Sequence, residues 1–112
     1  MTNSNPLSLD FLISKPEAAA QVLQSLEDQE AAIYLQEVPV RIVAPVLQEM
    51  QVWPASRILD QLSLEQNAAI FAQLPYQTVA ALLRLQQRAR RTELLAVLPA
   101  RLSRSLSVSL IY

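Results

Sequence analysis

The apolar residues of this chain recur every 12 positions, and this period restricts the possible folds more than any other feature. In one register of the repeat every residue is large and apolar: Leu23, Leu35, Leu47, Leu59, Phe71, Leu83 and Leu95. Two further registers are Val22, Tyr34, Val46, Ile58, Ile70, Leu82 and Leu94, and Leu26, Val38, Met50, Leu62, Leu74, Gln86 and Leu98. A fourth register holds small residues: Ala20, Ala32, Ala44, Ser56, Ala68, Ala80 and Thr92. A fixed period indicates a repeat architecture, in which each unit buries its apolar face against its neighbours.

Each unit of the repeat is predicted to be one short helix. The apolar residues of a unit are three or four positions apart, as in Ile58, Leu59 and Leu62, which is the spacing of one helical face. Ser63, followed by Gln66 three residues later, is typical of a capping box at a helix start.

Prolines mark the joints between units, because proline is tolerated in the first turn of a helix but not in its interior. Pro39, Pro75 and Pro99 share one phase of the repeat, and Pro54 opens another unit directly after Trp53, which we expect to be a packing staple. Pro45 falls inside a unit, and we expect it to delay that helix by a turn.

The predicted fold is all-α, a superhelix or solenoid of about eight short helices. Residues 1–14 lack the repeat and are expected to form an arm or partial helix, whereas residues 15–112 form the repeat domain. Such short helices are marginal alone, so they must be stabilised by packing; more than about 60% of residues should be helical, with no sheet. A non-repetitive helical bundle is less favoured because it would not show in-phase units. The predicted helices lie near 15–25, 29–37, 42–50, 54–61, 64–73, 76–86, 88–97 and 100–109.

The composition argues against an enzyme. The chain has no histidine, no cysteine and no glycine. These absences remove imidazole acid/base chemistry, thiolate nucleophiles, structural zinc and glycine-rich phosphate loops. Charged residues interrupt every apolar run before the ~18 residues that a membrane span needs, and no secretory signal is visible. We therefore predict a cytoplasmic binding or regulatory protein.

Charge is divided unevenly along the chain. Residues 1–83 carry three basic and nine acidic groups, whereas residues 84–112 carry six arginines and one glutamate. Four of these arginines are predicted to form a docking surface for an acidic partner: Arg84, Arg88, Arg90 and Arg91. The alternative is a solvated face that complements the acidic half of the same superhelix or of a second copy. Nucleic acid is disfavoured, because the net charge is −1 and no aromatic residues interleave the patch.

Two groups of carboxylates were considered as cation ligands. Glu27, Asp28 and Glu30 lie at a predicted helix start, where negative charge complements the helix dipole, and we prefer this capping interpretation. The best remaining candidates for a weak divalent site, spaced by about one repeat, are Glu37, Glu49 and Asp60.

The repeat units resemble those of the intracellular N-terminal domain of MgtE-type magnesium transporters. The stretches from Glu30 to Pro39 and from Asn67 to Pro75 both carry an alanine pair, further apolar residues and a closing proline. Residues 93–98, Glu-Leu-Leu-Ala-Val-Leu, resemble the family's penultimate helix, and the chain ends in Leu110, Ile111 and Tyr112, as the family does before its first CBS domain. The resemblance covers residues 17–112.

The resemblance implies a right-handed superhelix that docks on CBS domains and gates a magnesium channel as intracellular magnesium changes. The implied partners are the CBS domains and the transmembrane channel domain of the same parent chain, with a homodimer also possible. No cofactor would be tightly bound, although magnesium would bind in the full-length protein. The chain departs from the family at residues 78–81, Thr-Val-Ala-Ala, where relatives carry acidic residues. We therefore expect that the domain alone does not bind magnesium tightly. Flagellar switch proteins of the FliG type rank second, and a stand-alone adaptor for a protein partner ranks third.

Overall fold

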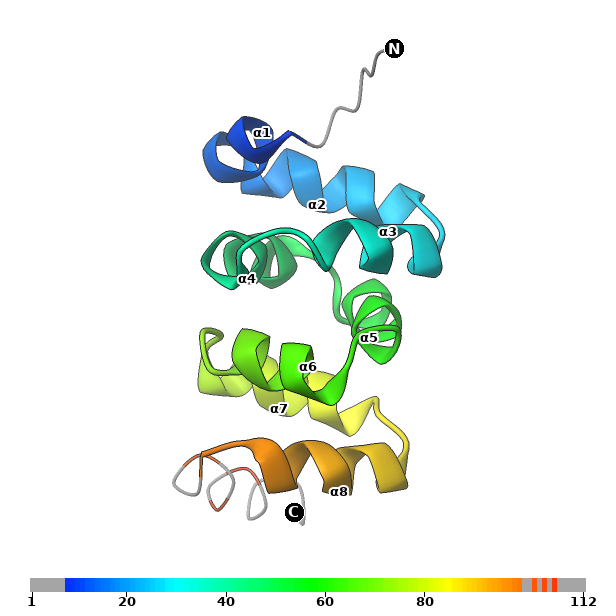
Figure 1. Cartoon of the computed structure of the whole chain (residues 1–112), viewed down its shortest axis with the longest axis vertical. Coiled ribbons are helices and arrows are strands. Elements are labelled where there is room, and N and C mark those ends of the chain that lie inside the picture. The colour runs from blue at the N-terminus through cyan, green and yellow to red at the C-terminus, as the bar shows by residue number, and fades with distance from the viewer. Residues whose placement is uncertain (1–7, 100–101, 103, 105, 107–112) are drawn as a thin grey trace.

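The computed structural model describes residues 8–99, 102, 104 and 106, and 77% of them are helical. No strand occurs in this part of the chain. The helices, shown in Figure 1, are α1 (Leu9–Ser14), α2 (Pro16–Ser25), α3 (Asp28–Leu35), α4 (Val40–Glu49), α5 (Val52–Asp60), α6 (Leu64–Phe71), α7 (Tyr76–Arg84) and α8 (Arg88–Val97). The all-α prediction is confirmed. Of the last predicted helix, 100–109, residues 102, 104 and 106 are helical, and the others lie outside the described residues.

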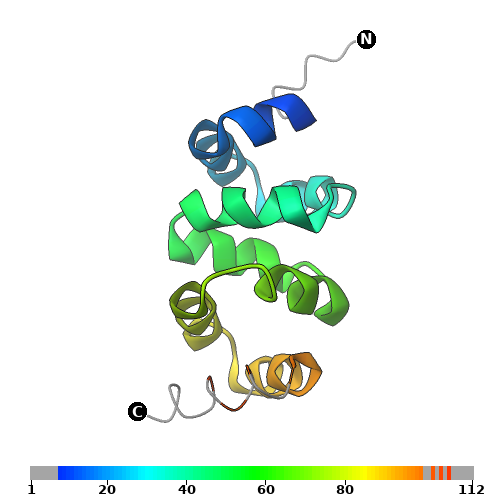
Figure 2. The same ribbon diagram turned by 90° about the vertical axis from the view of Figure 1, so that its left-hand side faces the viewer.

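Each helix from α2 to α6 packs on the helix two places further along the chain. The packed pairs are α2 with α4, α3 with α5, α4 with α6, α5 with α7, and α6 with α8, while α1 packs on α2 and α4. The two views in Figures 1 and 2 show the helices stacked along one axis, with α1 at one end and α8 at the other. These alternating contacts are consistent with the predicted solenoid, in which contacts are made mainly between neighbouring units.

The core follows the registers of the repeat. Leu23, Leu59, Phe71 and Leu83 are all fully buried, and Leu95, near the end of the stack, is partly buried. Residues of one register fall at the same place on successive helices, so they form a continuous apolar column where helices two units apart meet. The small-residue register is buried from Ala20 to Ser56, and it allows close approach of neighbouring helices.

The chain contains no glycine, and no described residue adopts the positive φ of a glycine C-cap. The last carbonyls of the helices are satisfied by tight i→i−3 bonds, such as the one from the Met50 amide to the Leu47 carbonyl at 3.1 Å. At the other termini, the predicted capping box of Ser63 and Gln66 is confirmed, with the Gln66 amide donating to the Ser63 hydroxyl at 3.0 Å. The capping interpretation of Glu27 is also confirmed, since it forms a capping box with Glu30.

The predicted bounds of the helices between residues 15 and 97 agree with the structure to within two residues, and two further features need comment. Residues 9–14, within the expected arm or partial helix, form α1, whose Leu12 is buried in the core. The expected delay at Pro45 is wrong: α4 starts at Val40 and passes through this proline. Pro45 is itself exposed, while the residues around it are buried. We attribute the continuous helix to that packing, which outweighs the hydrogen bond that proline cannot donate.

The expectation that Trp53 is a packing staple is also wrong, because the side chain is 62% exposed. Its register explains the orientation. The residues 12 before and 12 and 24 after it are Arg41, Glu65 and Gln77, which are all exposed. Trp53 therefore occupies the outward face of its unit, whatever its hydrophobicity.

Candidate functional site

Arg90, one of the arginines predicted to form a docking surface, forms hydrogen bonds to the backbone of its own fold. Its Nη2 donates to the carbonyl oxygens of Leu62 at 2.7 Å and Leu59 at 3.4 Å, at the C-terminal end of α5. The buried Asn67 amide donates to the same Leu59 oxygen at 2.9 Å and to the Ser63 carbonyl at 2.9 Å. Carbonyls at a helix C-terminus lack intrahelical partners, and cationic donors suit them best. Arg90 and Asn67 together therefore cap α5 from outside the helix.

The other three arginines lie on two separate helices. Arg84 ends α7 and Arg88 begins α8, with Gln87 as the N-cap between them, so their spacing of four is not that of a continuous helix. Arg91 Nη2 donates to the Gln86 carbonyl at 3.2 Å and caps the preceding turn. Arg84 and Arg88 are exposed, whereas Arg90 and Arg91 are partly buried. The predicted arginine surface is thus divided between exposed and capping residues, and its role in docking stays a prediction.

The three carboxylates proposed as cation ligands lie on different elements. Glu37 follows α3, and Glu49 is the exposed last residue of α4. Asp60 ends α5, with its Oδ1 3.8 Å from Arg90 Nε. Among the described residues no group of three or more acidic, histidine or cysteine side chains is placed to hold one metal ion. Each of the three candidates could therefore supply only part of a coordination shell, and magnesium commonly takes only one or two protein carboxylates.

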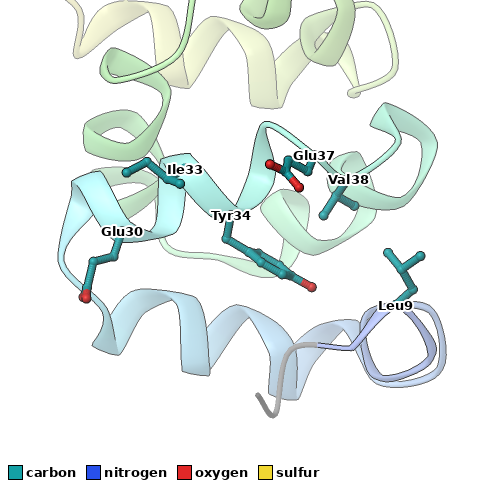
Figure 3. Close-up of a pocket in the computed structure, with 6 residues that line it drawn as sticks. All are labelled: Leu9, Glu30, Ile33, Tyr34, Glu37 and Val38. Atoms are coloured by element: carbon teal, nitrogen blue, oxygen red, sulfur yellow. The ribbon is translucent and has the colours of Figure 1, made fainter. Parts of the chain in front are cut away.

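A depression of about 520 Å³ lies between α1 and α3, and Figure 3 shows the side chains around it. We call it the α3 groove and define it by its lining residues, which are Leu9, Glu30, Ile33, Tyr34, Glu37 and Val38. The groove combines exposed apolar side chains with two carboxylates, and none of the described residues that line it is basic. Partial burial raises the pKa of the Tyr34 phenol above its ordinary value of 10.0. Lacking an activated nucleophile, this set of residues is suited to binding rather than to covalent chemistry.

The register of Ile33 in the repeat is a sequence signal for the groove. Ile33 belongs to a register that continues as Pro45, Arg57 and Ala69, and all of these residues are exposed. A large apolar residue in an outward register is therefore a candidate contact residue. The same reasoning applies to Trp53.

A buried polar pair lies apart from the groove. Gln86, the one polar member of its apolar register, is buried, and its Nε2 donates to the Ser56 hydroxyl at 3.1 Å. Ser56 belongs to the small-residue register of α5, 30 positions earlier. These two polar departures from the repeat are thus joined by one hydrogen bond in the core, while the buried Gln86 Oε1 has no hydrogen-bond partner among the described residues.

Comparison with known proteins identifies one family. Residues 14–112 match the family model described as the MgtE intracellular N domain. No curated protein and no solved structure gives a significant match. Among the helices of the described residues, none is long and apolar enough to cross a membrane.

Proposed function

Since the chain belongs to the family of MgtE intracellular N domains, we propose that it docks on CBS domains and gates a magnesium transporter as intracellular magnesium changes. The observation that carries this proposal is the family match over residues 14–112. The family is a regulatory part of magnesium transporters and not a catalytic family.

The helical stack suits a docking role. Its helices are short and hold one another through contacts two units apart, so its long sides present the outward residues of several helices on one surface. Solenoids commonly use such extended surfaces to bind partners. Gating would then follow from a docked state and a released state with different affinities for magnesium.

The free-energy coupling between magnesium binding and docking that gating requires can be estimated. To move a two-state equilibrium from 1:99 to 99:1, magnesium must favour one state by about 10⁴-fold, or about 5.5 kcal/mol. Magnesium keeps several of its waters and uses few protein carboxylates, so ions shared between two domains could provide this difference in steps. In this scheme Glu37, Glu49 or Asp60 would each contribute one ligand, and the partner would supply the others.

The proposal is tested by deleting residues 15–112 from the parent transporter and measuring magnesium uptake at low and high intracellular magnesium. We expect uptake at low magnesium to persist, because the transmembrane part is intact, and inhibition at high magnesium to be lost. Persistence at low magnesium also serves as the control for correct assembly. Unchanged inhibition in the deleted protein would contradict the proposal.

A further inference from the structure

We propose that the α3 groove binds a basic, amphipathic peptide segment of a partner protein, with a lysine or arginine on each side of an apolar pair. This inference goes beyond docking on CBS domains and can be tested separately from it. It rests on the geometry, exposure and charge of the groove.

Four of the residues that line the α3 groove form a stripe along one face of α3 and the turn that follows it. Glu30, Ile33, Tyr34 and Glu37 follow the i, i+3, i+4, i+7 spacing that puts residues on one face of a helix. Helical geometry continues past Leu35, because the C-cap Gln36 has φ −59 and ψ −25. At ~1.5 Å per residue the Cα atoms of Glu30 and Glu37 are about 10 Å apart along the axis. In Figure 3 they lie at the two ends of the stripe with Tyr34 between them.

The apolar part of the stripe is unusually exposed. Ile33 is 56% exposed and Leu9, on the opposite wall, is 46% exposed. These apolar side chains surround a depression in the surface. A partner that contributes apolar side chains would remove this surface from water.

The negative charge around the α3 groove favours a cationic partner. Residues 8–38 carry six carboxylates and one lysine. In the described part of the chain, Glu30 and Glu37 form no ion pair, since the two salt bridges found there join Arg57 to Asp28 and Arg90 to Asp60. A purely apolar ligand would take water away from the two carboxylates without replacing their interactions, which is costly. A ligand with cationic groups at both ends would satisfy them.

A second copy of this chain is a poorer occupant than a separate basic segment. Arg90 and Arg91 are engaged in capping their own fold, which leaves Arg88 as the exposed arginine of α8. The exposed large apolar residue of that helix is Val97, nine positions later. At 3.6 residues per turn, nine positions place the two side chains on opposite faces of the helix. The described residues of α8 therefore cannot present a basic and apolar stripe to the groove.

The test uses a short fluorescent helical peptide in which two lysines flank a Leu-Leu pair at positions i, i+3, i+4 and i+7. Binding to the whole chain is followed by fluorescence anisotropy at low salt. We expect the double variant Glu30→Gln/Glu37→Gln to bind the peptide roughly three- to tenfold more weakly, as the loss of two exposed ion pairs implies. Glutamine at position 30 can still complete the capping box, so the fold should be retained.

Matched variants separate the groove from general electrostatics. Ile33→Ala should weaken binding at least about threefold, because it removes an apolar contact at the centre of the stripe. Glu65→Gln and Val97→Ala change an exposed carboxylate and an exposed apolar residue elsewhere and should leave the affinity unchanged. Circular dichroism melts of all variants verify folding.

Three results would overturn the proposal. The first is equal binding of a peptide with glutamates in place of the lysines. The second is unchanged affinity of the double variant or of Ile33→Ala. The third is sedimentation showing a dimer of the chain that Ile33→Ala dissociates, because the groove would then be occupied by a second copy.

Discussion

Replacing Arg90 by alanine tests whether this residue caps α5 or belongs to a solvated docking face. If Arg90 is a cap, the substitution removes the 2.7 Å donor of the Leu62 carbonyl, which keeps the Asn67 amide at 3.4 Å. It also removes the 3.4 Å donor of the Leu59 carbonyl, which keeps the Asn67 amide and the Leu62 backbone amide. If Arg90 is instead a solvated surface residue, its replacement should change the free energy of unfolding by less than about 0.5 kcal/mol.

The magnitude follows from the contacts. A hydrogen bond from a charged donor contributes about 1.5–3 kcal/mol, and a cation at a helix C-terminus adds about 0.3–1 kcal/mol. The Arg90 side chain is 25% exposed, and water can partly replace it at the Leu62 carbonyl. We therefore expect Arg90→Ala to destabilise the domain by about 1.5–3 kcal/mol. The ion pair with Asp60 adds little, because it is 3.8 Å long and Asp60 is 46% exposed.

The assay is urea unfolding followed by far-ultraviolet circular dichroism. Arg88→Ala, on the same helix but exposed, is the matched control and should cost less than about 0.5 kcal/mol. Asp60→Asn should behave like the control, which separates the cap from the ion pair. If Arg90→Ala costs no more than Arg88→Ala, the capping interpretation is refuted.

Four further predictions follow from particular residues. Leu59→Ala should destabilise by about 2–5 kcal/mol in chemical denaturation, because the side chain is fully buried; a change below about 1 kcal/mol would contradict the proposed register. Ser56→Ala should cost about 1–3 kcal/mol by leaving the buried Gln86 amide without its partner, and adding Gln86→Leu should recover most of that loss. Partial burial raises the pKa of the Tyr34 phenol in the folded state, so the contribution of Tyr34 to stability is complete below about pH 10 and is lost as the pH rises through the folded pKa. Unfolding curves measured across that range should show this loss of stability in the unmodified chain and not in Tyr34→Phe. Magnesium at ~10 mM should raise the melting temperature by less than about five degrees relative to sodium chloride of equal ionic strength, whereas a ~1 mM site would add about 1.4 kcal/mol and exceed that shift.

The candidate site was only partly predictable. The carboxylates Glu30 and Glu37 stand out in the sequence, but their combination with Leu9 into one groove depends on how α1 packs on α2 and α4. Residues 1–14 lack the repeat, so periodicity said nothing about where Leu9 would lie. The arginines were predicted as one group because they are close in sequence. Their roles differ because Arg90 meets a helix end 28–31 positions earlier in the chain.

The sequence by itself determined the helices of the repeat, their approximate bounds and most of their buried residues, because a 12-residue period places apolar residues on the same face of each unit. It also determined the helix starts at Glu27 and Ser63, since capping boxes depend on residues three apart. Only the tertiary structure decided the path of α4 through Pro45 and the hydrogen bonds of Arg90 to the end of α5. Those outcomes depend on which helices meet across the stack, where contacts between distant segments outweigh the preferences of the individual residues.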